Sequence, residues 1–163
     1  MKIRLEKGAF TPRRAHDTDA GADIFAMADG VVPAGGSAIF HTGVHVELPI
    51  GTMGDVRSKS GLMFAHDILT FGTVDEGYDG EVMVKMFNLG KEDYHVHRGN
   101  KITQIATVRV VYEPIEIVDE IKAGERGSAG FGSTGKTVND TNRKEDKSDE
   151  DQENGDGAAT ASE

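Results

Sequence analysis

The sequence predicts an all-β fold with at most one short helix. Short apolar or alternating runs recur along residues 1–135, and turn residues separate them. No long stretch shows the period of about 3.6 residues that an amphipathic helix requires. Many short strands at this spacing are typical of a sandwich, a jelly roll or a barrel.

The expected strands follow from the apolar and alternating runs. In chain order they are residues 3–5, 22–26, 37–40, 44–48, 53–57, 81–88, 101–111 and 115–118. Turn signals rich in glycine, proline and asparagine lie between them, at 29–30, 35–36, 49–51, 79–80, 89–90 and 98–100. The one expected helix begins near Ser60, whose hydroxyl is a suitable N-cap for residues 61–65.

The last part of the chain differs in composition from the rest. Residues 136–163 contain one aliphatic side chain larger than alanine, Val138, and no aromatic residue, and they carry 4 basic and 9 acidic residues. Such a segment cannot bury enough apolar surface to offset its ordering entropy. We therefore expect one domain over residues 1–135, followed by an acidic disordered tail.

Charge and composition exclude several classes of protein. The net charge of −10 disfavours a nucleic-acid binder, because phosphate contacts along a duplex need clustered Lys and Arg. The absence of cysteine excludes disulfides, a thiolate zinc site and a cysteine nucleophile. The charged N-terminus is unlike a signal peptide, and no run reaches the roughly 18 apolar residues of a membrane span. We expect a cytoplasmic protein.

Residues 72–82 read Gly-Thr-Val-Asp-Glu-Gly-Tyr-Asp-Gly-Glu-Val, two extended arms around a turn that presents Asp75 and Tyr78. A carboxylate at that place could orient and deprotonate a water, and a tyrosine ring could lie against a sugar. The alternative is an ordinary hairpin in which Asp75 caps the turn.

A second block, residues 56–62, ends a strand in cations and hydroxyls and leads into the expected helix. Lys59 and Ser60 beside a helix N-terminus would suit an anion such as phosphate. The alternative is a capped helix with solvated charges.

The third block, residues 126–135, is rich in glycine and holds Arg126, Ser133 and Thr134 as donors for phosphate oxygens. Phe131 has no evident core role there and could stack on a base. The alternative is a glycine linker that continues into the tail. The run lacks the Gly-x-x-x-x-Gly-Lys-Ser/Thr of a Walker loop.

Residues 18–24 and 99–105 each open an expected strand, and they contain Asp23 and Gln104. Taken singly, these two side chains are ordinary turn or cross-strand hydrogen-bonding groups. All five blocks together, in this order, resemble the five sequence motifs of the trimeric dUTPases. The resemblance covers residues 18–135, and it is closest around Asp75 and at the end of the glycine-rich block.

The resemblance implies a distorted jelly-roll fold of the β-clip kind. It also implies a homotrimer that hydrolyses dUTP to dUMP and pyrophosphate, keeping uracil out of DNA and supplying dUMP for thymidylate synthesis. Each active site would lie between subunits, with residues 126–135 as a flexible arm from a third chain. The resemblance further implies that Mg²⁺ would be held by triphosphate oxygens and water, without direct protein ligands, which agrees with the reluctance of this metal to dehydrate. Asp23 and Gln104 would then be outer-shell residues.

The resemblance also assigns a role to each site residue. Asp75 would activate the attacking water, and Tyr78 would exclude a 2′-hydroxyl. The uracil edge would be contacted by Gly72, Thr73, Val74 and Met83, and the α- and β-phosphates by Lys59, Ser60 and Gly61. Gln104 would reach the phosphates or metal-bound water. The γ-phosphate and the base would be contacted by Arg126, Phe131, Gly132, Ser133 and Thr134.

Two features depart from the family pattern. Lys59 stands where the family usually has arginine, so either the contact geometry differs or Arg57 helps from two residues upstream. The stretch between Leu62 and Gly72 is short and lacks an asparagine to read uracil. Three other hypotheses stay open: a dCTP deaminase on the same fold, a protein-binding regulator that uses the tail, and a non-catalytic structural trimer.

Overall fold

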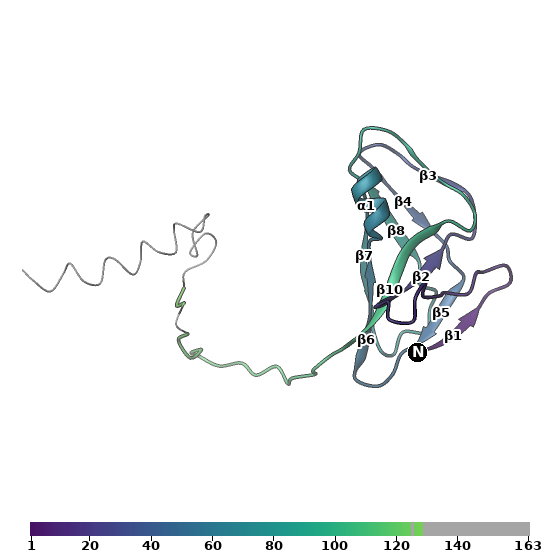
Figure 1. Cartoon of the computed structure of the whole chain (residues 1–163). Coiled ribbons are helices and arrows are strands. Elements are labelled where there is room, and N and C mark those ends of the chain that lie inside the picture. Colours follow the sequence, from purple (N-terminus) through teal and green to yellow (C-terminus); the bar gives the residue numbers. More distant parts are fainter. Residues whose placement is uncertain (125, 129–163) are drawn as a thin grey trace, which may run out of the picture. The chain divides into compact units, whose positions relative to one another are not determined.

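The computed structural model describes residues 1–124 and 126–128, and the chain divides into two compact units, Met1–Pro114 and Ile115–Glu163. Unit 1 holds the strands and the helix of the described residues (Figure 1). They are β1 Lys2–Leu5, β2 Gly21–Phe25, β3 Gly30–Val32, β4 Ser37–Phe40, β5 Val44–Glu47, β6 Thr52–Arg57, α1 Ser60–His66, β7 Ile68–Val74, β8 Val84–Asn88, β9 Tyr94–Val96 and β10 Lys101–Arg109.

This inventory confirms the prediction of an all-β fold with one short helix. Seven of the expected strands are present within a few residues of their expected bounds. The eighth, residues 115–118, is wrong, because the described residues of unit 2 contain no helix or strand. The expected disorder of residues 136–163 concerns a segment outside the described residues.

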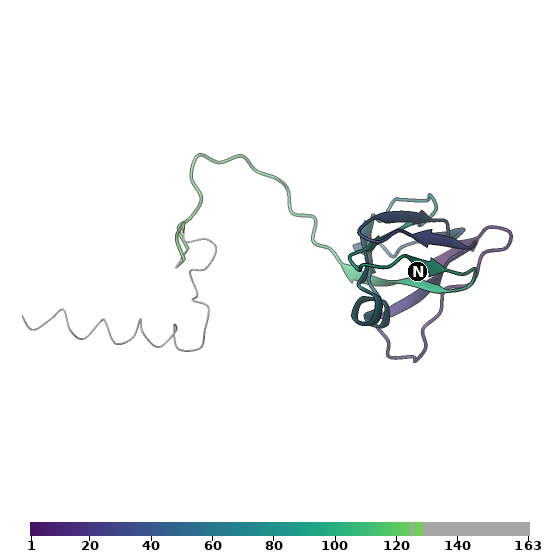
Figure 2. The same ribbon diagram turned by 90° about the horizontal axis from the view of Figure 1, so that it is seen from above.

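Ten strands form one large antiparallel sheet and two small ones. The large sheet has the order β2-β10-β6-β7-β8-β4, and the pairs β1-β5 and β3-β9 complete the fold. Seen from above, the strands of unit 1 lie in facing layers (Figure 2). Strands distant in sequence are therefore neighbours in space, and β10 lies between β2 and β6.

The core consists of two clusters of buried apolar side chains. One contains Ala22, Ile24, Val44, Val46, Leu48, Val56, Val74, Val82 and Ile105. The other contains Ala26, Val32, Phe40, Ile68, Val84, Met86, Val96 and Ile102. Because side chains alternate along a strand, burying Val56 turns Asp55 and Arg57 of β6 to the outer face of the large sheet.

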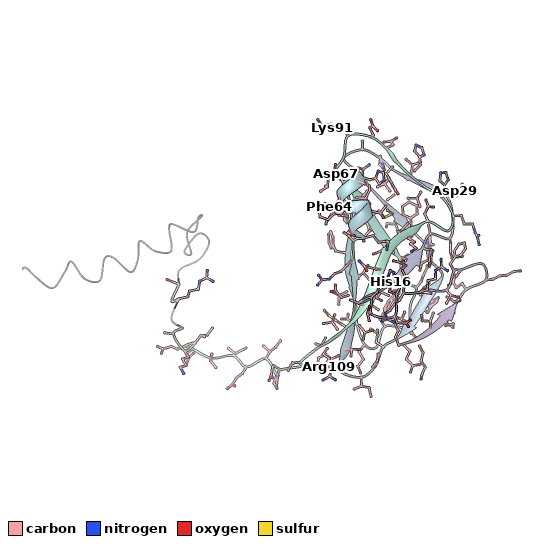
Figure 3. All side chains as sticks on the ribbon, in the orientation of Figure 1. His16, Asp29, Phe64, Asp67, Lys91 and Arg109 are labelled. Atoms are coloured by element: carbon pink, nitrogen blue, oxygen red, sulfur yellow. The ribbon has the colours of Figure 1, made fainter. Side chains whose placement is uncertain are left out.

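Helix α1 joins β6 to β7 directly. The N-cap is Lys59, which makes no side-chain capping bond, so the expected capping role of Ser60 is wrong and Ser60 is the first helical residue. At the other end Asp67 adopts a left-handed conformation with φ of 55°, and its N–H donates to the carbonyl of Met63. Figure 3 shows Phe64 and Asp67 at this helix. The left-handed residue lets β7 begin at once.

The described part of the chain contains no helix that could span a membrane, since α1 has only 7 residues.

Candidate functional site

A cleft lies where the second half of β7 faces the segment that leads into β8. We call it the hairpin cleft, and among its lining residues are Gly72, Thr73, Val74, Tyr78, Met83 and Lys85. Val74 is buried in the core, whereas Met83 is 53% exposed and Tyr78 is 46% exposed. The cleft therefore has an apolar, partly open wall.

The backbone of β7 along this cleft is an open sheet edge. Residues 71–74 pair with residues 54–57 of β6 on one side. On the other side the pairing with β8 ends at Thr70 and Met86, and no further strand in the described part of the chain takes its place. Half of the N–H and C=O groups of residues 71–74 thus face the cleft instead of a strand. Such an edge can bind a planar ring that carries complementary donors and acceptors.

The side chain of Glu81 anchors the turn that closes the hairpin cleft to the loop before β5. One oxygen of this carboxylate accepts hydrogen bonds from the backbone N–H groups of Thr42 and Gly43, each at 2.8 Å. The other oxygen lies 2.7 Å from Nδ1 of His41. The hydroxyl of Tyr78 donates to the carbonyl of Glu81 at 3.0 Å, so the tyrosine ring is fixed against the same anchor.

These contacts shift two ionisation equilibria. Burial raises the pKa of Glu81, but hydrogen bonds from Gly43, His41 and Thr42 lower it more, so that its pKa lies below the ordinary 4.5. The hydrogen bond to Glu81 raises the pKa of His41 above 6.5. The carboxylate is therefore charged at neutral pH, and it keeps the loop before β5 attached to the turn.

Glu76 anchors the same turn from the other end. Its Oε2 accepts from the N–H of Gly51 at 2.7 Å and from the hydroxyl of Tyr112 at 2.8 Å. The bond to Glu76 raises the pKa of Tyr112 above 10.0. Asp75, one residue earlier, is exposed, and its carbonyl accepts from the N–H of Tyr78 at 3.1 Å. Its carboxylate is thus presented at the turn and does not line the hairpin cleft.

A second cleft, of about 610 Å³, lies on the outer face of the large sheet. We call it the sheet-face cleft, and among its lining residues are Asp55, Arg57, Ser60, Leu69, Phe71 and Gln104. It shares Phe71, Gly72 and Thr73 with the hairpin cleft, so the two are adjacent along β7.

A chain of hydroxyl groups fixes the loop between β6 and α1 beside this cleft. Ser58 donates to the carbonyl of Thr70 at 2.9 Å and accepts from its N–H at 2.8 Å. The hydroxyls of Thr70 and Thr103 lie 2.8 Å apart, and Thr103 donates to the carbonyl of Arg57. Because Thr70 and Thr103 are buried, these bonds hold the segment that leads to Ser60 against β7 and β10.

Gln104 reaches the same loop from β10. Its Nε2 donates to the carbonyl of Ser58 at 3.0 Å. Gly21 of β2 makes room for this side chain, because a Cβ at Gly21 would lie 2.5 Å from Oε1 of Gln104. The glycine of one sequence block therefore supports the glutamine of another, which the sequence alone did not indicate.

The carboxylate of Asp23 forms ion pairs with two lysines. Oδ1 accepts from Nζ of Lys59, and Oδ2 accepts from Nζ of Lys101 at 2.7 Å. Burial raises the pKa of Asp23, but the hydrogen bonds from Lys101 and Lys59 lower it more, so the pKa of Asp23 lies below the ordinary 3.8. The side chain of Asp23 is only 7% exposed, so this is a largely buried carboxylate with two partners.

The two clefts bring together most of the predicted site residues. The hairpin cleft holds Gly72, Thr73, Val74, Tyr78 and Met83, and the sheet-face cleft holds Ser60 and Gln104, with Gly61 next in the helix. Lys59 contacts Asp23 instead of either cleft. Arg126 belongs to unit 2, and Phe131, Gly132, Ser133 and Thr134 lie outside the described residues.

Sequence reasoning missed the supports of the site. Glu81 was assigned only as the start of a strand, and the roles of Ser58, Thr70 and Thr103 were not predicted. No local pattern indicates them, because the partners of these side chains lie 12 to 46 positions away in sequence.

The described residues include no group of three His, Asp or Glu side chains that could hold a metal ion. Asp23 has both oxygens occupied by ammonium groups. Among these residues, the donor set therefore fits a Mg²⁺ ion that is held by the phosphates of a ligand and by water.

Comparison with known proteins points to one family. The family model described as dUTPase matches residues 8–135. The deoxyuridine 5′-triphosphate nucleotidohydrolase of Clostridium acetobutylicum is 42% identical over 132 residues, covering 78% of this chain and 91% of the relative. The enzyme of the same name from Gloeothece citriformis is 44% identical over 134 residues, covering 78% of this chain and 92% of the relative.

Solved structures agree with these relatives. The Staphylococcus bacteriophage 80alpha dUTPase with dUpNHpp has a TM-score of 0.74 and 28% identity, covering 83% of this chain and 98% of that protein. A mutant dUTPase of phage phi11 of S. aureus, described with a structural Mg(II) ion, has a TM-score of 0.68 and 25% identity, covering 73% of this chain and 96% of that protein.

Proposed function

This chain belongs to the dUTPase family, and from that premise we propose that it hydrolyses dUTP to dUMP and pyrophosphate with the help of Mg²⁺. Water attacks the α-phosphorus, the bond from that phosphorus to the α–β bridging oxygen breaks, and pyrophosphate leaves. The product dUMP supplies thymidylate synthesis, and removal of dUTP keeps uracil out of DNA.

The open edge of β7 is the observation that best supports a uracil nucleotide. Uracil presents an acceptor, a donor and an acceptor along one edge, and the free backbone groups around Gly72, Thr73 and Val74 can pair with that pattern. Met83 lines the opposite side of the hairpin cleft. Cytosine reverses part of the pattern, so it would leave backbone groups unpaired and bind less well.

Tyr78 is proposed to select the sugar. Its hydroxyl is bound to the carbonyl of Glu81, so the ring cannot swing away from the hairpin cleft without breaking that bond. A deoxyribose packed on the ring would leave no room for a 2′-hydroxyl. This arrangement would exclude UTP.

Asp75 is proposed as the residue that orients and deprotonates the attacking water. It precedes the turn that Tyr78 closes, and Glu76 holds that turn against Gly51. Its carboxylate is exposed on the described chain, so a bound nucleotide and neighbouring subunits would have to enclose it.

The phosphates are proposed to lie against Ser60, Gly61 and Gln104, with Lys59 close by. The hydroxyl network of Ser58 holds this loop in place before any ligand arrives, which lowers the ordering cost of binding. Mg²⁺, bound by the triphosphate and water, would neutralise charge on the leaving group. Asp23 and Gln104 would be no closer than its outer shell.

We further propose a homotrimer with sites shared between subunits, in which Arg126, Phe131, Gly132, Ser133 and Thr134 form the arm that covers the γ-phosphate and base. The domain would then extend over residues 1–135, and residues 136–163 would be dispensable for turnover. The cytoplasmic location and a regulatory protein partner stay predictions.

One assay tests the activity: pyrophosphate release from dUTP, dTTP, dCTP and UTP, with and without Mg²⁺. We expect release from dUTP alone, and only with the metal. Asp75→Asn should lower kcat by about 10²–10⁴-fold. Asp79→Asn is the matched control, because it makes the same charge change four residues later in the segment between β7 and β8, and it should be near wild type. Equal rates on UTP would rule out the role of Tyr78.

A further inference from the structure

The ammonium of Lys59 is already engaged by a carboxylate. It donates to Asp23, which also accepts from Lys101, and the side chain of Lys59 is only 24% exposed. Moving this ammonium onto a phosphate would leave Asp23 with one partner in a largely buried place, which is costly. Lys59 is therefore poorly placed to supply the cation of the sheet-face cleft.

Arg57 is placed differently. In the register of the large sheet it lies directly between Gln104 of β10 and Phe71 of β7. Its side chain is 72% exposed and lines the sheet-face cleft together with Ser60 and Gln104. Among the described residues, neither Lys59 nor Lys101 lines that cleft.

The guanidinium of Arg57 is also oriented. Its Nε donates to Oδ2 of Asp55 at 2.5 Å, and the carboxylate of Asp55 is 17% exposed. A guanidinium has five N–H donors in one plane, so a bond through Nε sets the direction of the terminal nitrogens, which can take a second anion as a fork. A lysine at this position could not be fixed in this way.

We propose that Arg57, and not Lys59, binds the phosphate chain in the sheet-face cleft, and that Lys59 and Lys101 serve to neutralise and hold Asp23. This inference rests on the proposed nucleotide function, and it names the residue that supplies the cation. The family usually has an arginine at the position of Lys59. In this chain the arginine is Arg57, two residues upstream, on the outward-facing side of β6.

Calorimetry on the full-length protein can test this with two ligands: dUpNHpp, whose α–β bridge is not hydrolysed, and deoxyuridine, which has no phosphate. Arg57→Gln should weaken dUpNHpp binding by about 10- to 100-fold, as expected for lost charge-assisted hydrogen bonds. Its affinity for deoxyuridine should match that of wild type. Arg57→Lys should fall between, because the charge remains and the fork is lost.

Two further variants make the comparison specific. Arg109→Gln removes an exposed arginine from the far end of β10 (Figure 3) and should bind both ligands as wild type does. Lys59→Gln should weaken dUpNHpp less than Arg57→Gln and lower the melting temperature more.

A larger loss of dUpNHpp affinity in Lys59→Gln than in Arg57→Gln would overturn the inference. An equal loss of deoxyuridine affinity in Arg57→Gln would do so as well, because it would indicate damage to the whole site. The proposed function is judged separately, since it fails only if the wild-type protein does not hydrolyse dUTP.

Discussion

Replacing Glu81 with alanine tests whether the hairpin cleft depends on its buried anchor. The carboxylate is 16% exposed and accepts from the backbone N–H groups of Thr42 and Gly43. Alanine leaves both donors without an acceptor in a region where Thr42 is fully buried. A buried donor that loses its partner costs about 1–3 kcal/mol. Two such donors would together cost about 2–6 kcal/mol. Water that enters the space left by the side chain recovers part of this loss, so we expect Glu81→Ala to lower the free energy of unfolding by about 3 kcal/mol.

Glu81→Gln gives an intermediate case. The amide oxygen can still accept from both N–H groups, but the charge and the pairing with His41 are lost, so the expected loss is about 1 kcal/mol. Both variants should lower kcat/KM for dUTP by about tenfold or more, because the Glu81 side chain positions the backbone carbonyl that accepts the hydrogen bond from Tyr78.

The effect should depend on pH in a defined direction. Because the pKa of Glu81 is lowered in the folded protein, its contribution is present above 4.5 and is lost as pH falls through the folded value. Because the pKa of His41 is raised, the contribution of the imidazolium is present below 6.5 and is lost as pH rises through its folded value. The difference between wild type and Glu81→Gln should therefore be largest between these two limits.

Urea denaturation at one fixed protein concentration measures these differences, because assembly makes stability depend on concentration. Glu47→Ala is the control: that carboxylate pairs with Lys2 but is 68% exposed, and such pairs contribute about 0–1 kcal/mol. If Glu81→Ala and Glu47→Ala lose the same stability, the anchoring role of Glu81 is refuted.

Two other variants probe the rest of the site. Asp23→Asn should destabilise the fold by about 2 kcal/mol at pH 7, because two ammonium groups would then face a neutral amide. Because the pKa of Asp23 is lowered in the folded protein, the difference in urea midpoint between the variant and wild type should shrink as pH falls below 3.8. Ending the chain after Lys136 should leave dUTP turnover nearly intact, whereas ending it before Arg126 should abolish turnover; equal behaviour of the two truncations would contradict the proposed boundary between arm and tail.

Local pattern sufficed for the elements that alternate clearly or follow a turn signal. Strand β4 has the predicted bounds of 37–40, β6 differs by one residue, and the helix lies near Ser60 as expected, although Ser60 is its first residue and not its N-cap. These segments carry their own signal, because alternation of buried and exposed side chains is a property of the strand itself.

Strand β7 was missed because its sequence, Ile-Leu-Thr-Phe-Gly-Thr-Val, combines threonines and a glycine with weak alternation. It is a strand because β6 and β8 pair with its two ends and because Asp67 turns the chain out of α1. Residues 115–118 show the reverse case. They alternate well, yet Ile115 and Ile117 are each 98% exposed, and no strand forms in the described part of unit 2.

The sequence by itself determined the class of fold, the order of the five blocks and the identity of the chemical groups in each. Only the tertiary structure decided which cation faces which anion. Lys59 meets Asp23 across 36 positions, and Arg57 turns outward beside Gln104. The physical reason is that the direction of a side chain follows from strand register and burial, which depend on partners far along the chain.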